Sequence, residues 1–454
     1  MASVSQLLLF LLCSYHALIA SAVDVQSYKI LATSSQKPQA VCSEPTRTLG
    51  LPLSSGATVP LNHRQGPCSP VVSSKKKPTL EELLRRDQLR AGYVQRKFSN
   101  NNHRANSGLQ SSEVTVPTTL GSSLDTLEYV ITVELGSPAV KQTMIIDSGS
   151  DVSWVHSSSG SPFDPAKSST YVPLSCGAPA CTQLGGEGNG CSKNGQCQYM
   201  VMYGDGSNTT GGYGSDKLAL TASETVDSFQ FGSSQVEEGF RDKTDGLMGL
   251  GGDTQSLVSQ TAATYGKAFS YCLPPTTSSS GFLTLGAPSG GTSGFATTGM
   301  LRSPQARTFY GALLQGISVG GKMVGVAPSV FSAGSVMDSG TIITRLPPTA
   351  YKAFSTAFKE GMKQYQTVPA RSILDTCFDF SGQDNVTIPS VSLVFDGGAV
   401  VDLDANGIIY GSCLAFTATD DDGTTGIIGN VQQRTLEVLY DVGKSVLGFR
   451  ANAC

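Results

Sequence analysis

Two stretches far apart in the chain share one pattern, an apolar run that ends on Asp-Ser-Gly. Residues 144–146 lead into Asp147, and residues 335–337 lead into Asp338. In each stretch Gly lets the backbone turn sharply, and Ser supplies a hydroxyl beside the carboxylate. Two such loops that face each other would place two carboxylates in one site, where like charges favour a shared proton. A site of this kind holds an acid and a base side by side, as hydrolysis of a peptide bond by water requires.

A second repeated pattern links the two stretches, although a single Asp-Ser-Gly is equally typical of an ordinary surface turn. Residues 247–249 read Leu-Met-Gly, and Gly249 lies 102 residues after Asp147. Residues 427–429 read Ile-Ile-Gly, and Gly429 lies 91 residues after Asp338. Apolar-apolar-Gly at matched distances predicts two duplicated lobes, each with a strand that supports its own aspartate loop.

Together these motifs resemble those of the pepsin-like aspartic proteases, and within them the plant nepenthesin-like group, from about residue 128 to 454. The resemblance implies an all-β, bilobal pepsin-like aspartic protease fold with two pseudo-symmetric β-barrel-like lobes and an N-terminal prosegment. We expect a signal peptide at residues 1–22, a basic prosegment at 23–112, an N-terminal catalytic lobe at 113–305 and a C-terminal catalytic lobe at 306–454. Short strand-like runs broken by Gly, Pro and Ser fit an all-β chain, with short helices expected at 256–265 and 349–365.

The resemblance gives Asp147 and Asp338 the catalytic roles. One would take a proton from a water held between them while the other gives a proton to the scissile carbonyl oxygen, and the residues leave open which is the base. The neighbouring residues of both loops are expected to support the carboxylates or to lie along the substrate: Ser148, Gly149, Ser150, Ser339, Gly340 and Thr341. Ser148 stands where the family commonly has Thr, so a packing methyl is missing although the hydroxyl remains.

Residues 201–207 read Val-Met-Tyr-Gly-Asp-Gly-Ser, and Asp-Gly between strand-like runs is typical of a hairpin turn. A mobile hairpin over a cleft would exclude water and hold the substrate backbone. By resemblance Tyr203 is the flap tyrosine, and Gly204, Asp205 and Gly206 lie along the substrate. Trp154, seven residues after Asp147, corresponds to the family tryptophan whose indole N–H reaches that tyrosine.

The first 22 residues contain a short apolar run and end on Ala-Ser-Ala, which is typical of a cleaved signal peptide. No later stretch approaches the roughly 20 apolar residues that cross a bilayer. We therefore expect a soluble protein of the secretory pathway, extracellular (apoplast) or vacuolar, without a membrane anchor.

Charge is divided unevenly along the chain. Residues 23–112 carry 13 Lys and Arg against 5 Asp and Glu, whereas residues 113–454 carry 18 against 30. A basic leader on an acidic body suggests an intramolecular inhibitor that is held electrostatically and loosens when carboxylates become protonated. The acidic body argues against nucleic-acid binding, and a basic helix that lies on a membrane is the alternative.

Two stretches of this leader carry more specific signals. Residues 61–70 resemble a prosegment motif of the nepenthesin-like group. Thr79 to Glu82 reads as a capping box that starts a helix to about Phe98. Leu80, Leu83, Leu84 and Val94 give that helix an apolar side, whereas Arg85, Arg86, Arg90, Arg96 and Lys97 lie elsewhere on it.

The body of the chain has an even number of cysteines, which suggests disulfides in a secreted protein: Cys176, Cys181, Cys191, Cys197, Cys272, Cys377, Cys413 and Cys454. By resemblance Cys377 pairs with Cys413, and a Cys272–Cys454 bridge would tie the end of the chain to the first lobe. The other four allow three pairings, which the sequence leaves open. Asn385 and Asn208 begin glycosylation sequons, and Asn385 is the stronger candidate.

These features lead to one expected function and one alternative. The first is a secreted aspartic endopeptidase that acts on polypeptides at acidic pH as a monomer, with its own prosegment as inhibitor and without cofactor or metal. The alternative is a catalytically inactive pepsin-fold binding protein, such as the plant inhibitors of microbial xylanases. Both aspartates, both Ser-Gly pairs and Tyr203 are present, which favours catalysis.

Overall fold

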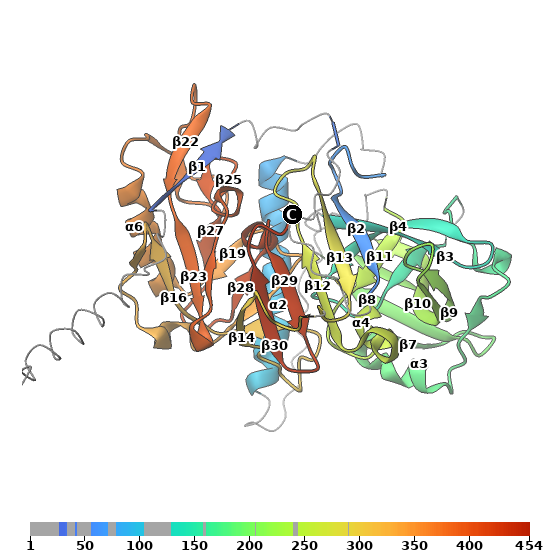
Figure 1. Ribbon diagram of the computed structural model, residues 1–454. Helices are drawn as coiled ribbons and strands as arrows, with labels where there is room; N and C mark the ends of the chain where they lie inside the picture. Colours follow the sequence, from blue (N-terminus) through green and yellow to red (C-terminus); the bar gives the residue numbers. More distant parts are fainter. Residues whose placement is uncertain are drawn as a thin grey trace, which may run out of the picture.

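The computed structural model describes residues 27–33, 41–42, 56–70, 79–103, 129–157, 160–204, 206–238, 244–288 and 290–454. The expected signal peptide, much of the expected prosegment and Asp205 lie outside the described residues. The chain folds mainly into strands, and two β-rich lobes stand on either side of helix α2 (Leu80–His103) (Figure 1). The predicted all-β, bilobal fold is confirmed. No helix among the described residues is long and apolar enough to span a bilayer.

The first lobe is built on a 15-stranded sheet that also takes in the last two strands of the chain. Its spatial order is β14 (Ala296–Gly299), β30 (Val446–Arg450), β29 (Glu437–Asp441), β12 (Ala268–Cys272), β13 (Ser280–Leu285), β2 (Thr58–His63), β3 (Tyr129–Leu135), β4 (Val140–Asp147), β11 (Gly246–Gly249), β5 (Trp154–His156), β10 (Thr225–Glu238), β9 (Asn208–Ala219), β8 (Cys197–Met202) and β7 (Gly188–Cys191), with β6 (Val172–Pro173) beside β9. Short helices α3 (Pro179–Gln183), α4 (Leu257–Gln260) and α5 (Ala262–Tyr265) lie in the connections.

The second lobe has three smaller sheets and helix α6 (Pro348–Gly361). The first of these sheets has the order β15 (Gly311–Ala312), β18 (Ser335–Met337), β28 (Gly426–Ile428), β19 (Thr344–Leu346) and β27 (Phe416–Ala418). The second has the order β17 (Lys322–Met323), β16 (Leu314–Val319), β23 (Val391–Phe395) and β24 (Val400–Asp402). The third has the order β20 (Thr367–Val368), β21 (Cys377–Phe378), β26 (Cys413–Leu414) and β25 (Ile409–Tyr410). The helices expected near 256–265 and 349–365 are present as α4, α5 and α6.

The two repeated motifs have equivalent places in the two lobes. Strand β4 ends on Asp147 and runs parallel to β11, with Gly249 opposite Asp147. Strand β18 ends directly before Asp338 and runs parallel to β28, whose Ile428 carbonyl accepts the Asp338 N–H at 3.1 Å. A Cβ on Gly249 or Gly429 would collide with the backbone of the loop that follows the aspartate. The repeated apolar-apolar-Gly pattern therefore supports both aspartate loops, as predicted.

The N-terminal segment, meaning the described residues between 27 and 103, forms more regular structure than expected. Strand β2 lies between β13 and β3 inside the large sheet, and β1 (Tyr28–Ala32) pairs with β22 (Asn385–Pro389) of the second lobe. The sequence predicted a helix in this leader but no strand, because a six-residue strand gives too few alternations to stand out. The backbone edges of β3, β13 and β22 supply hydrogen-bond partners for β1 and β2, and the local sequence carries no signal of this pairing.

The structure contains five disulfides among its described residues. Cys272–Cys454 and Cys377–Cys413 are the expected pairs. The clustered cysteines, whose pairing the sequence left open, join as Cys176–Cys191 and Cys181–Cys197. The N-terminal segment has a bridge of its own, Cys42–Cys68, which the sequence analysis did not propose.

The Cys272–Cys454 bridge closes a loop of 182 residues, whereas Cys176–Cys191 closes one of 15. A long loop restricts the unfolded chain more, so replacing Cys272 and Cys454 by Ser should lower the free energy of unfolding by about 2 kcal/mol more than the same change at Cys176 and Cys191. Chemical denaturation of the two double variants measures this difference. Equal losses, or a larger loss at the short loop, would contradict the expected order.

Candidate active site

The carboxylates of Asp147 and Asp338 are completely buried, and each is held by its own loop in the same way. In both loops one oxygen accepts the N–H of the second residue after the aspartate, and the other accepts the hydroxyl of the third. The donors are the Gly149 N–H (2.9 Å) and Ser150 Oγ (2.8 Å) for Asp147, and the Gly340 N–H (3.1 Å) and Thr341 Oγ1 (2.5 Å) for Asp338. Such bonds stabilise an ionised carboxylate. The two halves of the site are thus chemically equivalent.

The two loops also bind each other across the interface between the lobes. The Ser148 N–H donates to Ser339 Oγ at 3.1 Å, and the Ser339 N–H donates to Ser148 Oγ at 2.9 Å. Both serines are buried, so these reciprocal bonds are not exchanged with water. They fix the distance between Asp147 and Asp338 through the backbone that carries them.

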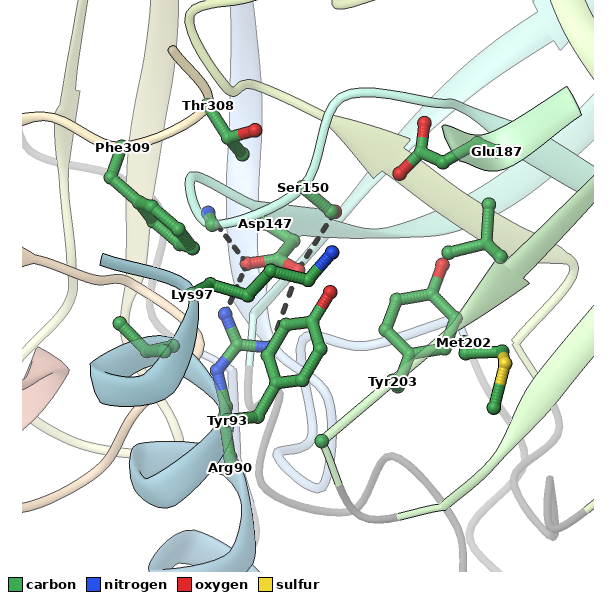
Figure 2. Close-up of a pocket in the computed structure, with 14 residues that line it drawn as sticks. Arg90, Tyr93, Lys97, Asp147, Ser150, Glu187, Met202, Tyr203, Thr308 and Phe309 are labelled. Atoms are coloured by element: carbon green, nitrogen blue, oxygen red, sulfur yellow. Dashed lines mark hydrogen bonds and ion pairs between the residues drawn. The ribbon is translucent and has the colours of Figure 1, made fainter. Parts of the chain in front are cut away.

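One guanidinium group, that of Arg90 on helix α2, binds both carboxylates, and Figure 2 shows its contact with Asp147. Its Nη2 lies 2.6 Å from Asp147 Oδ1 and 2.7 Å from Asp338 Oδ1, and its Nε donates to Asp338 Oδ2 at 2.9 Å. The two aspartates predicted from sequence are therefore brought together at a single nitrogen atom. Arg90 itself was grouped with the basic residues away from the apolar side of the helix, and that interpretation was wrong.

A pattern in the sequence could have identified Arg90. Leu83, Asp87, Arg90, Val94 and Phe98 follow the three- and four-residue spacing of one helix face. Asp87 and Arg90 interrupt that face with charges. Charged residues in the register of an apolar face are buried only when they are paired, so the spacing indicates ionic partners elsewhere in the chain.

The charges in this site shift the pKa values of its members. Burial alone would raise the pKa of Asp338, but the charge of Arg90 and hydrogen bonds from Arg90, Thr341 and Gly340 bring it below its usual value. Burial opposes the charge on Arg90, yet the two carboxylates raise the pKa of this guanidinium well above its ordinary range. Arg90 therefore stabilises the ionised form of Asp338 without a shared proton.

Helix α2 fills the space between the lobes through its apolar side. Leu83 and Leu84 pack against a buried cluster of the second lobe that includes Ile342 and Ile343. Further along the helix, the buried side chains are Ala91, Val94 and Phe98, in a cluster that also contains Ala306, Phe309, Val336 and Ile427. The capping box is present at its start, where the Thr79 N–H donates to Glu82 Oε2 and the Glu82 N–H donates to Thr79 Oγ1.

The predicted flap is a hairpin turn between β8 and β9. The Tyr203 N–H donates to the Ser207 carbonyl at 2.8 Å, and Trp154 Nε1 donates to the Tyr203 hydroxyl at 2.6 Å. Gly204 lies so close to Tyr93 of helix α2 that a Cβ there would collide with that side chain. A cavity of only about 60 Å³ remains between helix, flap and Asp147 (Figure 2). Asp205 at the turn is outside the described residues.

The two glycosylation candidates differ in their distance from the flap along the chain, because Asn208 follows the flap turn directly and pairs with Met202. Asn385 is exposed at the start of β22, and Asn208, at the start of β9, donates from Nδ2 to Glu238. Within the described part of the chain, no group of three or more His, Cys, Asp or Glu residues has the arrangement of a metal site.

The reciprocal serine bonds give a direct test of the junction. Ser148→Ala should lower the free energy of unfolding by about 1–3 kcal/mol, because the buried Ser339 N–H loses its acceptor. Ser148→Thr keeps the hydroxyl and should stay within about 1 kcal/mol of the parent. Denaturant unfolding of both variants provides the comparison. A Ser148→Ala protein as stable as the parent would show that the reciprocal bonds between Ser148 and Ser339 do not hold the two loops together.

Comparison with known proteins places this geometry in a family. Residues 129–287 match the family model described as Xylanase inhibitor N-terminal, and residues 309–451 match Xylanase inhibitor C-terminal. The chain is 40% identical to an aspartyl protease family protein of Arabidopsis thaliana over 414 residues (87% of this chain, 86% of that protein). It is 34% identical to aspartic proteinase nepenthesin-2 of Nepenthes gracilis (84% and 88%).

Solved structures agree in fold. The crystal structure of edgp covers 73% of this chain and 93% of its own, with a TM-score of 0.60 at 21% identity. The crystal structure of basic 7S globulin from soybean covers 71% and 90%, with a TM-score of 0.59 at 20% identity. At this identity the likeness speaks for the fold alone. With the sequence relatives and the paired aspartate loops, it leads to one assignment: the chain belongs to the pepsin-like aspartic proteases, in the plant nepenthesin-like group.

Proposed function

We propose that this protein is a secreted aspartic endopeptidase, made as an inactive precursor and active at acidic pH. The observation that carries the proposal is the equivalent placement of the Asp147 and Asp338 carboxylates around one nitrogen atom of Arg90. A water molecule that takes the place of this atom would contact both carboxylates. The relatives named aspartyl proteases and nepenthesin support the same reaction.

In the proposed reaction the ionised carboxylate of the pair takes a proton from that water as its oxygen attacks the scissile carbonyl carbon. The protonated carboxylate gives its proton to the carbonyl oxygen, so a neutral tetrahedral diol forms. As the diol collapses, the ionised carboxylate takes a proton from one diol hydroxyl while the protonated carboxyl gives its proton to the amide nitrogen, so the C–N bond breaks and the amine leaves. Asp147 and Asp338 share these roles, and the hairpin that carries Tyr203 closes over the substrate backbone.

The N-terminal segment is the proposed inhibitor, and Arg90 is its central group. The Arg90 guanidinium occupies the position that the reaction assigns to water, and the Tyr93 side chain sits against the flap at Gly204. Helix α2 thereby excludes a substrate from the space between the lobes. Five disulfides support a protein that folds in an oxidising compartment, as the expected signal peptide would require. Its destination is then the apoplast or the vacuole.

Acid should release this inhibitor, and the direction follows from Asp338. With Arg90 bound, the pKa of Asp338 is lowered below its usual value, whereas the free pair shares a proton because like charges repel. Opening therefore takes up protons. The stability that Asp338 gives the closed state is complete above the pKa of the free pair, decreases as pH falls below that value, and is lost once pH falls through the lowered pKa of Asp338 in the closed state. Burial raises the pKa of Asp87, so that residue does not contribute to acid release.

The catalytic proposal is tested by proteolysis of a denatured protein at acidic pH. Full-length protein that has been acid-activated should cleave it, a statine-type inhibitor should block cleavage, and Asp338→Asn should reduce the rate at least about 100-fold. Asp420→Asn, at an exposed acidic residue, is the matched control and should retain the rate. Absence of inhibitable cleavage by the parent at any acidic pH would favour a binding protein, the alternative suggested by the xylanase-inhibitor family models.

The inhibitor is tested by Arg90→Gln. Without the guanidinium the cleft loses its central ionic contact, so the full-length variant should become active or process itself at least about one pH unit closer to neutral than the parent. Arg96→Gln changes an exposed arginine of the same helix and should leave the pH of activation unchanged. The pH dependence of inhibitor-sensitive cleavage provides the readout. Identical profiles for Arg90→Gln and the parent would remove Arg90 from the proposal.

A further inference from the structure

A second ionic contact joins helix α2 to the second lobe, one helical turn before Arg90. The carboxylate of Asp87 is fully buried there. Its Oδ1 accepts the Ile342 N–H at 2.5 Å, and its Oδ2 accepts the Ile343 N–H at 3.3 Å. The same Oδ2 lies 2.9 Å from Arg345 Nη2. Two backbone donors and one cation thus surround a single carboxylate.

The groups that bind this carboxylate belong to the body of the protein and are fixed there independently of the helix. Residues 342–345 follow directly on the Asp338 loop and lead into strand β19. Arg345 Nη1 donates to the Ile343 carbonyl at 2.6 Å, which orients the guanidinium toward the neighbouring N–H groups. The Arg345 side chain is 2% exposed, and its contacts from helix α2 are to Asp87 and to Gln88 Oε1 at 3.3 Å. When helix α2 leaves, the lobe retains a buried cation without its carboxylate.

A buried Arg345 guanidinium that has lost the Asp87 carboxylate favours the binding of another carboxylate in its place. A buried charge is costly unless it is paired and hydrogen-bonded, and a guanidinium with adjacent N–H donors matches the shape and charge of a carboxylate. Substrate would occupy the space that helix α2 vacates, because the same helix carries Arg90 into the aspartate pair. An acidic side chain of the substrate can therefore reach the position of the Asp87 carboxylate.

We propose that the Ile342 N–H, the Ile343 N–H and Arg345 form a substrate subsite that selects an acidic side chain. The inference rests on the proposed protease function and adds a substrate class to it. Asp87 occupies the subsite in the closed protein as an internal mimic of that side chain. The three residues from Asp87 to Arg90 rise about 4.5 Å along the helix, little more than one residue of an extended chain, and the Arg90 side chain adds its own length. The selected residue therefore lies about two or three positions from the scissile bond.

The test uses acid-activated full-length protein and matched peptides that place Glu, Gln or Leu at successive positions around one scissile bond. In solution most of the Glu side chains are ionised at pH 5, and the donors of the subsite must offset the burial that raises the pKa of Asp87 at the same place. At one position, two or three residues from the scissile bond, the Glu peptide should exceed the Gln peptide in kcat/KM by about 10- to 100-fold, as expected for a site built to hydrogen-bond one group. Equal kcat/KM values for Glu and Gln at every position would overturn the subsite.

Variants assign the preference to Arg345. The double variant Asp87→Asn with Arg345→Gln removes both charges, so neither is left buried alone during folding. Its Glu-to-Gln ratio should fall to near one. The control is Arg371→Gln, at an exposed arginine of the same lobe, which should keep the parental ratio. A double variant that retains the parental ratio would overturn the proposal, and the ratio is independent of the amount of active protein.

Binding separates this inference from the protease proposal. If the parent cleaves none of the peptides, the catalytic proposal fails, and calorimetry of the Glu and Gln peptides with the same acid-treated protein then tests the subsite directly. Binding of the Glu peptide at least about 10-fold more tightly than the Gln peptide, lost in the double variant, would support it. Equal affinity of the two peptides would overturn it.

Discussion

Two carboxylates buried at one point are the constraint on which this structure depends. Neither Asp147 nor Asp338 has access to solvent, and each accepts hydrogen bonds from its own loop. Two such charges repel strongly in a buried site, so the molecule must supply either a shared proton or a cation. In the closed protein the cation is Arg90, and in the proposed active protein the proton takes its place. The proposed inhibition and the proposed catalysis are then two ways of neutralising the same pair.

The remainder of the fold keeps this pair in place. Strands β11 and β28 pack beside the strands that carry the aspartates, and the Ser148 and Ser339 bonds join the two loops directly. The N-terminal segment contacts the rest of the protein in three places. Strand β2 lies in the large sheet, strand β1 pairs with the second lobe, and helix α2 lies between the lobes. Of these, only the ionic contacts in the cleft respond directly to the protonation of the aspartate pair.

The sequence predicted the features that repeat or that follow local rules. The two Asp-Ser-Gly stretches, the apolar-apolar-Gly strands and the capping box at Thr79 each have a short-range signature, and the structure places them as expected. The Cys272–Cys454 pair was also anticipated. Pairings within the Cys176–Cys197 cluster were left open, because four close cysteines have several sterically possible partners.

The features that sequence reasoning missed depend on partners distant in the chain. Strands β1 and β2 become strands because edges elsewhere accept their backbone bonds, and six residues carry too little periodicity to predict this. Arg90 looked like one more basic residue of a solvated helix, since its partners lie 57 and 248 residues away. The signal available in the sequence was the position of Arg90 in the register of the apolar helix face, and Asp87 lies in the same register.

The central claim is that Arg90 replaces a proton shared by the aspartate pair, and a difference titration tests it most directly. Potentiometric titration of full-length Arg90→Gln and parent protein between pH 3 and pH 7, restricted to the pH values at which both chains remain uncleaved on a gel, gives the number of protons bound by each. The account predicts that the variant binds about one more proton than the parent in the middle of this range. Superimposable titration curves would contradict it.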